Sequence, residues 1–341
     1  MDNIRVLINQ LSTGKSFNVD EASALMTLIM EGEATPGQIG SILTALSIKG
    51  ETAEEIAGMA KTMQDKSLSV DFMGQVADSC GTGGDNSRTF NISTTAALVA
   101  SAAGLTMAKH GNRAASGTCG SADVLEALGV NIDLNPKEVL KCLDEVGFGF
   151  LFAPNFHPAM KYAGPIRKEI GIRTVFNILG PLTNPARAKH QLIGVHDPKL
   201  GPILAEVLVL MGTQHSMVVH GADGLDEISL GGTTEIWEVN LSTINYYKIS
   251  PDEFGIKPAN KSQLTAETLT DNVHLLVKVL SGEKGPHRDI VLLNTAGVLI
   301  AGNLVTDFNE GISCAGEAID SGKAKTKLEE LLRVTQSLHV D

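Results

Sequence analysis

Apolar residues in the first part of the chain recur at the three- and four-residue spacing of amphipathic helices. Four such groups precede residue 66, and their members are Ile4, Leu7, Ile8 and Leu11; Ala22, Leu25, Met26 and Ile29; Ile39, Ile42, Leu43 and Leu46; and Ile56, Met59, Ala60 and Met63. We therefore expect four short helices that form a small all-helical unit over residues 1–66. Nothing in this region has the pattern of a catalytic site.

Helix-capping residues agree with this periodicity. Pro36, directly preceded by threonine, fits the first position of a helix. Thr52 and Glu55 fit a capping box. Gly32 and Gly50 lie where C-terminal glycine caps are expected.

From Val76 onward, strand-like runs alternate with helical patterns. The expected strands cover residues 76–80, 105–109, 148–153, 191–196 and 217–220, and the expected helices cover 95–103, 122–128, 136–146 and 203–211. Residues 236–239 and 244–249 indicate a hairpin, and the chain is helical from Leu264. This alternation is typical of an α/β fold. We predict a small all-α N-terminal domain followed by a larger α/β domain with a mostly parallel central sheet flanked by helices.

Composition and charge limit the classes of partner. The formal net charge of −12 argues against nucleic acid or an anionic membrane. An anionic substrate would therefore need positive charge concentrated at its site. The four cysteines lie far apart, which indicates reduced thiols in a cytoplasmic enzyme and neither a disulfide framework nor a zinc site. The N-terminus has no apolar signal core, and no apolar run approaches membrane-spanning length.

A glycine-rich stretch, Cys80–Thr94, follows the first expected strand and leads into a helix. This order forms an anion site because the first backbone N–H groups of a helix are unpaired and its dipole is positive there. Gly81, Gly83 and Gly84 carry no side chain that would block a phosphate. Asp85 would repel one, so we expect it to contact sugar hydroxyls or a backbone amide. A purely structural turn is the alternative.

A second stretch, Lys109–Asp123, also joins a strand to a helix and would lie at the same carboxyl edge of the sheet. Lys109 and Arg113 supply the missing positive charge. Two such units side by side could hold a ligand with two separate phosphate groups. A solvated loop charge is the alternative for Arg113, and the residues alone favour a backbone-bonded turn histidine for His110.

Adjacent carboxylates follow a third strand, within Gly221–Glu227. A turn with solvated acids is one interpretation. The other is a Mg²⁺ site, because Mg²⁺ prefers one or two carboxylates together with phosphate oxygens and water. Beside a diphosphate site, the metal interpretation is favoured.

Several motifs together carry a resemblance to a known family. They are Gly81–Asp85, Lys109–Arg113, Gly120–Asp123, His157–Lys161, Arg167–Thr174, Asn177–Pro185 and Asp226–Glu227. In order, spacing and context they resemble the anthranilate phosphoribosyltransferases over nearly the whole chain. The pyrimidine nucleoside phosphorylases share this fold family and are the alternative function, but their Lys-His-Ser-Thr-Gly-Gly type loop is absent here.

The resemblance implies an enzyme that joins anthranilate to 5-phosphoribosyl diphosphate (PRPP), an early step of tryptophan synthesis. It implies PRPP contacts at Gly81, Gly84, Asp85, Thr89, Asn91, Ile92, Ser93, Thr94, Lys109, His110, Gly111, Asn112, Arg113, Ala114, Ala115, Ser116, Gly117 and Ser121. It implies anthranilate contacts at Gly81, His110, Asn112, Arg167 and Pro181. Ser93 and Glu227 would be ligands of Mg²⁺, with Asp226 serving the metal-bound diphosphate. Many members carry a second serine where Gly117 stands, so we expect one fewer hydroxyl contact there.

The implied reaction needs stabilisation of the leaving diphosphate more than it needs a base. Mg²⁺ and Lys109 would offset the charge on that group, and we assign no acid–base pair. The planar fork of Arg167 suits the anthranilate carboxylate, whereas spacing alone would favour a helix-surface ion pair with Glu169 or a neighbour.

The implied architecture joins the helical unit of residues 1–66 to a helical insertion near residues 160–185, with an α/β domain over residues 74–341. The family implies a homodimer through the helical domain. Residues 73–75 are either a hinge or an ordinary loop. A catalytically inactive nucleic-acid-binding relative and a dinucleotide-binding dehydrogenase are further alternatives, disfavoured by the net charge and by the glycine spacing respectively.

Overall fold

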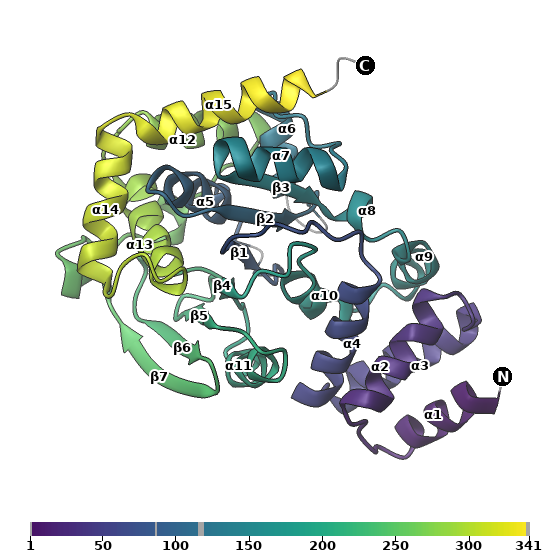
Figure 1. The fold of residues 1–341 in the computed structure, drawn as a ribbon. Helices are drawn as coiled ribbons and strands as arrows, with labels where there is room; N and C mark the ends of the chain where they lie inside the picture. Colours follow the sequence, from purple (N-terminus) through teal and green to yellow (C-terminus); the bar gives the residue numbers. More distant parts are fainter. Residues whose placement is uncertain (1, 86, 115–118, 339–341) are drawn as a thin grey trace.

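The computed structural model of the protein describes residues 2–85, 87–114 and 119–338. Among these residues, seven strands form one sheet in the order β3-β2-β1-β4-β5-β6-β7 (Figure 1). Their bounds are β1 Ala77–Gly81, β2 Met107–Gly111, β3 Phe148–Phe152, β4 His190–Gly194, β5 His215–Gly221, β6 Thr234–Asn240 and β7 Thr243–Ile249. The strands from β3 to β5 are parallel, and β6 and β7 add an antiparallel hairpin. The predicted α/β fold class is thus confirmed.

Four capped helices form the N-terminal region. They are α1 Asp2–Ser12, α2 Val19–Met30, α3 Pro36–Lys49 and α4 Ala53–Asp65. Thr35 and Thr52 each accept a hydrogen bond from the backbone three residues onward, which completes two capping boxes. Gly32 and Gly50 have φ of 75° and 84°, as expected for glycines that end helices. The N-terminal helices and caps are therefore confirmed.

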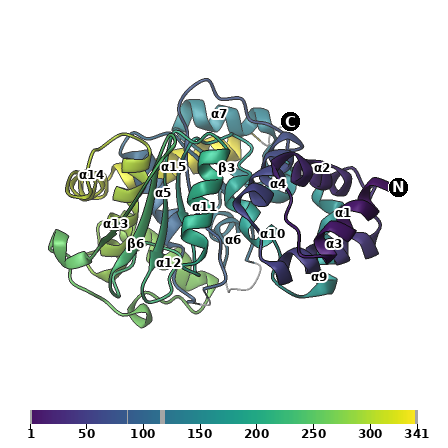
Figure 2. The same cartoon turned by 90° about the horizontal axis from the view of Figure 1, so that it is seen from below.

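A later segment packs against these helices. It contains α8 Ala153–Phe156, α9 Met160–Ile170 and α10 Phe176–Leu179. Helix α9 contacts α2 and α3, and α10 contacts α4. Figure 2 shows α9 and α10 beside the N-terminal helices, at one side of the sheet. We call α1–α4, α9 and α10 the helical region.

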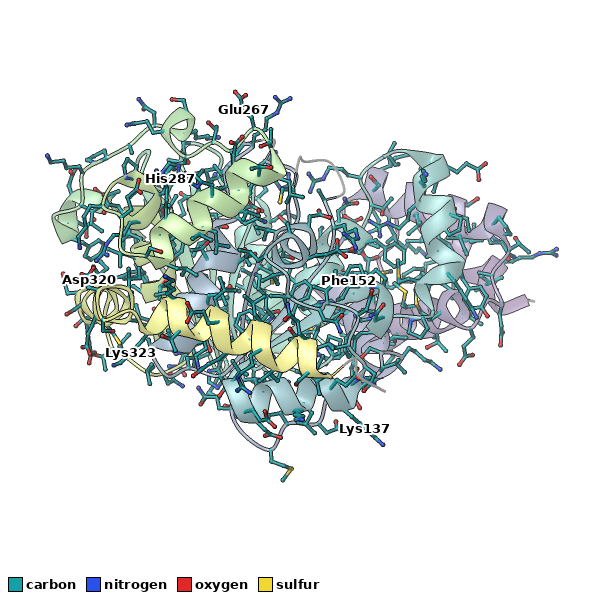
Figure 3. All side chains as sticks on the ribbon, turned by 90° about the horizontal axis from the view of Figure 1, so that it is seen from above. Lys137, Phe152, Glu267, His287, Asp320 and Lys323 are labelled. Carbon is teal, nitrogen blue, oxygen red and sulfur yellow. The ribbon has the colours of Figure 1, made fainter. Side chains whose placement is uncertain are left out.

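The remaining helices cover the two faces of the sheet. They are α5 Ile92–Ala102, α6 Ser121–Ala127, α7 Pro136–Val146, α11 Leu200–Leu210, α12 Leu269–Leu280, α13 Pro286–Ala301, α14 Phe308–Asp320 and α15 Lys323–Ser337. One apolar cluster joins α5, α7 and α12–α15 to one face of the sheet. A second cluster joins the opposite face to α11 and the helical region. Phe152, at the end of β3, lies on the side of this α/β body nearest the helical region (Figure 3).

Helix α5 begins at Ile92, earlier than the predicted start at residue 95. Its first turn therefore contains Ser93 and Thr94, which places their backbone N–H groups at the carboxyl edge of the sheet. No helix of the described ranges is long and apolar enough to cross a membrane.

Candidate active site

The turns after β1 and β5 lie in direct contact at the carboxyl edge of the sheet. The Gly83 N–H donates to Asp226 Oδ2 at 2.8 Å. A Cβ on Gly81 would overlap Asp226 Oδ2, and a Cβ on Gly194, at the end of β4, would overlap the Asp226 carbonyl oxygen. Glycine is therefore required at both positions because the chain carrying Asp226 approaches their backbone closely.

Lys109 brings the turn after β2 to the same place. Its side chain is 1% exposed, and Nζ donates to the Ser79 carbonyl oxygen and to Ser93 Oγ, the latter at 3.4 Å. The Ser93 backbone lies close to the Glu227 carboxylate and lowers its pKa. The structure thus brings Lys109, Ser93 and Glu227 together, beside the contact of Gly83 with Asp226.

Three carboxylates gather at this point with incomplete charge compensation. Burial raises the pKa of Glu227 well above its usual value, Asp226 raises it further, and Lys109 opposes the shift. Burial raises the pKa of Asp226 to about 6, with Asp85 acting in the same direction. A buried acidic group of this kind fits a divalent cation.

A cation bound here would take further ligands from phosphate and water. Among the residues the structure describes, no three His, Cys, Asp or Glu side chains are arranged to hold a metal ion. Mg²⁺ tolerates this, because it keeps water and takes phosphate oxygens alongside one or two carboxylates. Asp226, Glu227 and Ser93 therefore fit a Mg²⁺ that arrives with a phosphorylated ligand.

The start of α5 offers polar groups to such a ligand. Asn91, the N-cap residue, makes no side-chain cap, and its backbone N–H donates to Asn272 Oδ1 at 3.0 Å. Asn91 Oδ1 and Thr94 Oγ1 are buried with no hydrogen-bond partner within the described ranges. Asp85 Oδ1 accepts from the Ser87 backbone N–H at 3.2 Å, which matches the backbone-amide alternative for that carboxylate.

Thr89 lies farther along the same turn. Its hydroxyl is 3.1 Å from that of Ser87, and its backbone forms an isolated bridge with Thr265. Thr89 therefore fixes the turn to the segment before α12, and its side chain is already engaged.

Asp78, which no sequence pattern indicated, connects β1 and β2 to the turn after α10. Its side chain is fully buried. Oδ1 accepts from the His110 N–H at 3.2 Å, and Oδ2 accepts from Asn184 Nδ2 at 2.8 Å. Asn184 Nδ2 also donates to the Ala108 carbonyl oxygen at 2.7 Å. This network fixes β1, β2 and the 180–185 turn in one register.

Two neutral histidines face each other beside that turn. His110 Nδ1 lies 3.1 Å from the Gly180 carbonyl oxygen, to which it donates, as the backbone-bonded interpretation predicted. The His157 ring lies 5.1 Å away. Burial lowers the pKa of His110 to about 3 and that of His157 to about 4. Both Nε2 atoms are buried without a partner in the described part of the chain, and donation from Nδ1 to Gly180 leaves the His110 Nε2 as an acceptor.

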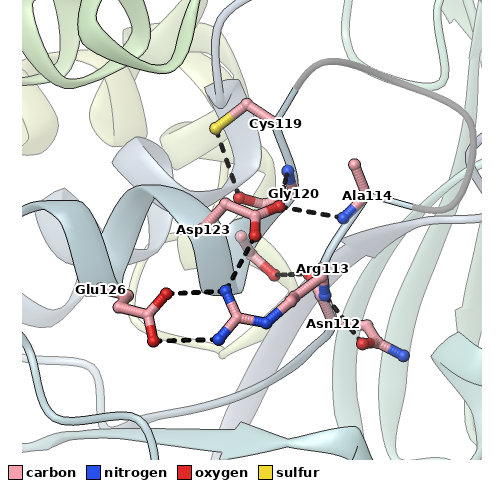
Figure 4. Close-up of polar contacts among 8 residues, drawn as sticks. Asn112, Arg113, Ala114, Cys119, Gly120, Asp123 and Glu126 are labelled. Carbon is pink, nitrogen blue, oxygen red and sulfur yellow. Dashed lines mark hydrogen bonds and ion pairs between the residues drawn. The ribbon is translucent and has the colours of Figure 1, made fainter.

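Arg113 points to helix α6 (Figure 4). Its guanidinium pairs with Glu126 at 2.7 and 2.9 Å and with Asp123 at 3.1 Å, and it stacks 5.5 Å from the Phe152 ring. Arg113 is exposed, as the solvated-charge alternative describes, and its charge is already compensated. Asp123 Oδ2 also accepts from the Ala114 and Gly120 N–H groups.

The rest of this turn is partly outside the described residues. Ala115, Ser116 and Gly117, which the resemblance assigns to the PRPP site, lie outside the described residues. Asn112 is exposed, and its carbonyl oxygen accepts from Ser121 Oγ at 3.4 Å. Gly111 allows the close approach of Ser121 and Phe150, because a Cβ would overlap Ser121 Oγ.

Arg167 lies in the last turn of α9, in the helical region. Its guanidinium stacks 5.0 Å from the Phe176 ring, and burial lowers the pKa of Arg167. Within the described ranges it forms no ion pair, so the alternative pairing with Glu169 is wrong. Pro181 is buried, and its carbonyl oxygen accepts from Gln191 Nε2 at 2.8 Å. In the described part of the chain, no hydrogen bond or ion pair joins the Arg167 side chain to the sheet-edge turns.

Arg173 is a second site residue that no local sequence pattern indicated. A Cβ on Gly84 would overlap Arg173 Nη1, so the guanidinium covers the glycine turn. The residue was part of a motif, but no local pattern marked its side chain.

Two family models match the chain, one over the N-terminal helices and one over the α/β part. Residues 5–67 match the helical bundle domain and residues 73–325 the a/b domain of a glycosyl transferase family. The chain is 51% identical to an anthranilate phosphoribosyltransferase of Dehalococcoides mccartyi over 337 residues, 98% of this chain and 99% of the relative. It is 48% identical to that of Symbiobacterium thermophilum over 339 residues, 99% of each.

Solved structures of anthranilate phosphoribosyltransferases also superpose on nearly the whole chain. The anthranilate phosphoribosyltransferase of Thermus thermophilus superposes with a TM-score of 0.92 at 40% identity, covering 98% of this chain and 100% of that one. The Saccharomyces cerevisiae enzyme in complex with PRPP and Mg superposes with a TM-score of 0.90 at 31% identity, covering 98% of each. These relatives favour the transferase interpretation over the nucleoside phosphorylase alternative.

Proposed function

The chain belongs to the anthranilate phosphoribosyltransferase family, and we propose that it transfers the 5-phosphoribosyl group of PRPP to the amine of anthranilate. The products are N-(5-phosphoribosyl)anthranilate and diphosphate, which places the enzyme in tryptophan biosynthesis. The observation that carries this proposal is the meeting of Gly83, Lys109 and Glu227 at one sheet edge.

We propose that the donor lies along this edge. The dipole of α5 favours phosphate at the start of that helix, beside the glycine turn whose Gly83 N–H already donates to Asp226. Asn91 and Thr94 add buried polar atoms without partners among the described residues. Lys109 would contact phosphate with little rearrangement because its side chain already reaches Ser93. Arg113 would have to leave Glu126 to do the same.

Mg²⁺ would be held by Glu227 and Ser93, with Asp226 serving the metal-bound diphosphate. The S. cerevisiae relative was solved with PRPP and Mg, which supports this choice of cation. When bound, it would neutralise part of the charge that develops on the departing diphosphate. Lys109, which is buried beside Glu227, would contribute in the same direction.

We propose that anthranilate lies between the sheet edge and the helical region, near His110, Pro181, Asn112 and Arg167. The S. cerevisiae relative has also been solved with 4-fluoroanthranilate. A pKa of about 3 makes His110 a poor base, so its free Nε2 would position the amine by accepting a hydrogen bond. The aromatic amine already has a lone pair, and placement therefore matters more than deprotonation. Arg167 would bind the carboxylate through its planar fork.

The organisation of the molecule is part of the proposal. We propose a helical domain of residues 1–66 joined by the insertion near 160–185, and an α/β domain of residues 74–341. We further propose a homodimer through the helical domain, supported by exposed apolar side chains at Val6 on α1 and Ile48 on α3, 61% and 82% exposed. The four unpaired cysteine thiols support a cytoplasmic location.

The test is loss of anthranilate fluorescence when the protein is incubated with PRPP and Mg²⁺. We expect turnover that stops when Mg²⁺ is chelated, and no phosphorolysis of thymidine or uridine. Asp226→Asn combined with Glu227→Gln should abolish turnover, and near-normal rates would remove the metal assignment. Lys109→Ala should weaken PRPP binding in titration calorimetry. Arg167→Ala should chiefly raise the KM for anthranilate; a rise confined to PRPP would reverse the two half-sites.

A further inference from the structure

The donor site needs a cation that the residues assigned so far do not fully provide. The chain as a whole is acidic, and three carboxylates gather at the site. Lys109 is buried beside Glu227, and Arg113 is paired with Glu126 and Asp123. Lys109 reaches the site only from a buried position beside Ser93, and Arg113 would first have to leave its carboxylate partners.

Arg173 has the required position. It lies between α9 and α10, so its main chain belongs to the helical region. Its carbonyl oxygen accepts from Ser47 Oγ on α3 at 3.0 Å, and the next residue, Thr174, is buried with its N–H donating to Asn177 Oδ1 at 3.0 Å. The backbone is therefore fixed on one side of the site while the side chain reaches the other.

The guanidinium covers the glycine turn. Gly84 has φ of 86° and no room for a Cβ, because Arg173 Nη1 occupies that space. The pKa of His196 is lowered chiefly by burial and then by Arg173, whereas Asp85 raises it; Arg173 and Asp85 thus act on the same imidazole. Arg173 is exposed, and it forms no ion pair within the described ranges. Its charge is available.

We propose that Arg173 binds the diphosphate end of PRPP. This inference rests on the proposed function and adds a residue to it. The diphosphate end is favoured because Asp226, which would serve the metal-bound diphosphate, accepts from the Gly83 N–H, directly before the glycine that Arg173 covers. A guanidinium binds a phosphate through two parallel hydrogen bonds.

The experiment compares Arg173→Ala, Arg173→Lys and Lys168→Ala. Lys168 is an exposed cation at the end of α9 and controls for the loss of one positive charge from the same segment. Binding of diphosphate with Mg²⁺, and of PRPP with Mg²⁺, is measured by titration calorimetry. The KM values for PRPP and anthranilate are measured alongside, at low and high salt.

We expect Arg173→Ala to weaken diphosphate binding by about ten- to one-hundredfold, to raise the KM for PRPP, and to leave the KM for anthranilate within about twofold. Arg173→Lys should recover part of the loss, because the ammonium keeps the charge and loses the fork. PRPP binding should also become less sensitive to salt in Arg173→Ala. Lys168→Ala should match the wild type.

Wild-type diphosphate affinity in Arg173→Ala, with an active wild-type enzyme, would overturn this inference and leave the proposed function intact. A loss confined to anthranilate would overturn it as well, since it would place Arg173 in the acceptor half of the site. A wild-type protein that neither binds diphosphate nor turns over would overturn both. Because the Arg173 side chain is exposed, all variants should unfold at the wild-type midpoint.

Discussion

Asp78→Asn tests how the two halves of the site are held in register. The carboxylate is fully buried and accepts from two donors, the His110 N–H and Asn184 Nδ2. An asparagine has one oxygen and one NH₂ group in the same place, so one donor must face another donor. Asn184 cannot turn over to relieve this, because its Nδ2 donates to Ala108 and its Oδ1 accepts from the Ala186 N–H at 2.8 Å.

The magnitude follows from these contacts. A buried donor without a partner costs about 1–3 kcal/mol, and exchanging a charged acceptor for a neutral one costs about 1 kcal/mol more. Burial raises the pKa of Asp78, with Lys109 opposing the shift. Removing the carboxylate therefore relieves desolvation but leaves the buried Lys109 less compensated, and we take these two effects to offset each other. The expected loss of unfolding free energy is about 2–4 kcal/mol.

The assay combines urea denaturation with steady-state kinetics. Because Asp78 holds both His110 and the 180–185 turn, we expect a higher KM for anthranilate and a lower kcat in the variant. Asn184→Asp in the Asp78→Asn background restores a donor–acceptor pair between the two side chains while it removes the bond to Ala108. The double variant should recover at least about 1 kcal/mol relative to additivity. Stability within about 0.5 kcal/mol of the wild type, together with an unchanged KM, would refute this account of Asp78.

Three further variants probe other parts of the structure. Gly81→Ala should displace Asp226 and reduce Mg²⁺-dependent turnover at least about tenfold. The control is Gly164→Ala in α9, where a Cβ meets nothing within 4 Å, and it should stabilise the protein slightly. Equal activities of the two variants would contradict the close contact at Gly81. His157→Gln should flatten the pH dependence of stability. The folded pKa of His157, about 4, lies below the ordinary 6.5, so this residue alone contributes a loss of about 2 kcal/mol between pH 7 and 5 as the unfolded state takes up the extra proton. Identical slopes in denaturation series of wild type and variant would exclude a neutral buried imidazole. Asn294→Ala removes the buried side chain that binds both the N–H and the carbonyl oxygen of Ile228, the residue after Glu227. The substitution should cost about 2–5 kcal/mol of unfolding free energy and raise the Mg²⁺ concentration needed for half-maximal rate. An unchanged Mg²⁺ dependence would show that these two hydrogen bonds do not position Glu227.

Local sequence patterns predicted those helices and strands whose stabilising contacts lie within one short segment. Helix periodicity and caps suffice for α2, α3 and α4, because their N-caps and apolar stripes lie within the same short segments. Strand β1 was weakly marked because it buries Asp78 and Ser79 instead of an apolar run. Its polar groups are satisfied by His110 and Asn184, far along the chain, and no sequence window contains that information.

The residues of the candidate site also fall into two groups, those that a local motif indicated and those whose role depends on contacts distant in sequence. Glycine turns and charged residues at strand ends indicated Gly83, Lys109 and Asp226–Glu227, because parallel strands bring their carboxyl ends to one edge. Arg173 was missed since its role depends on a contact with Gly84 across the two regions. Asn184 and Asn294 were missed because they bind backbone and side-chain groups distant in sequence. The compensation of Arg113 by Glu126 likewise depends on how the turn folds back onto α6.

A crystal structure of the protein with PRPP and Mg²⁺ tests the central claim most directly. The account predicts one diphosphate beside the Gly83 N–H, with a Mg²⁺ about 2.1 Å from a Glu227 carboxylate oxygen and with Lys109 in contact with the same donor molecule. Density for PRPP at a place that leaves Gly83, Lys109 and Glu227 without a shared ligand would contradict it.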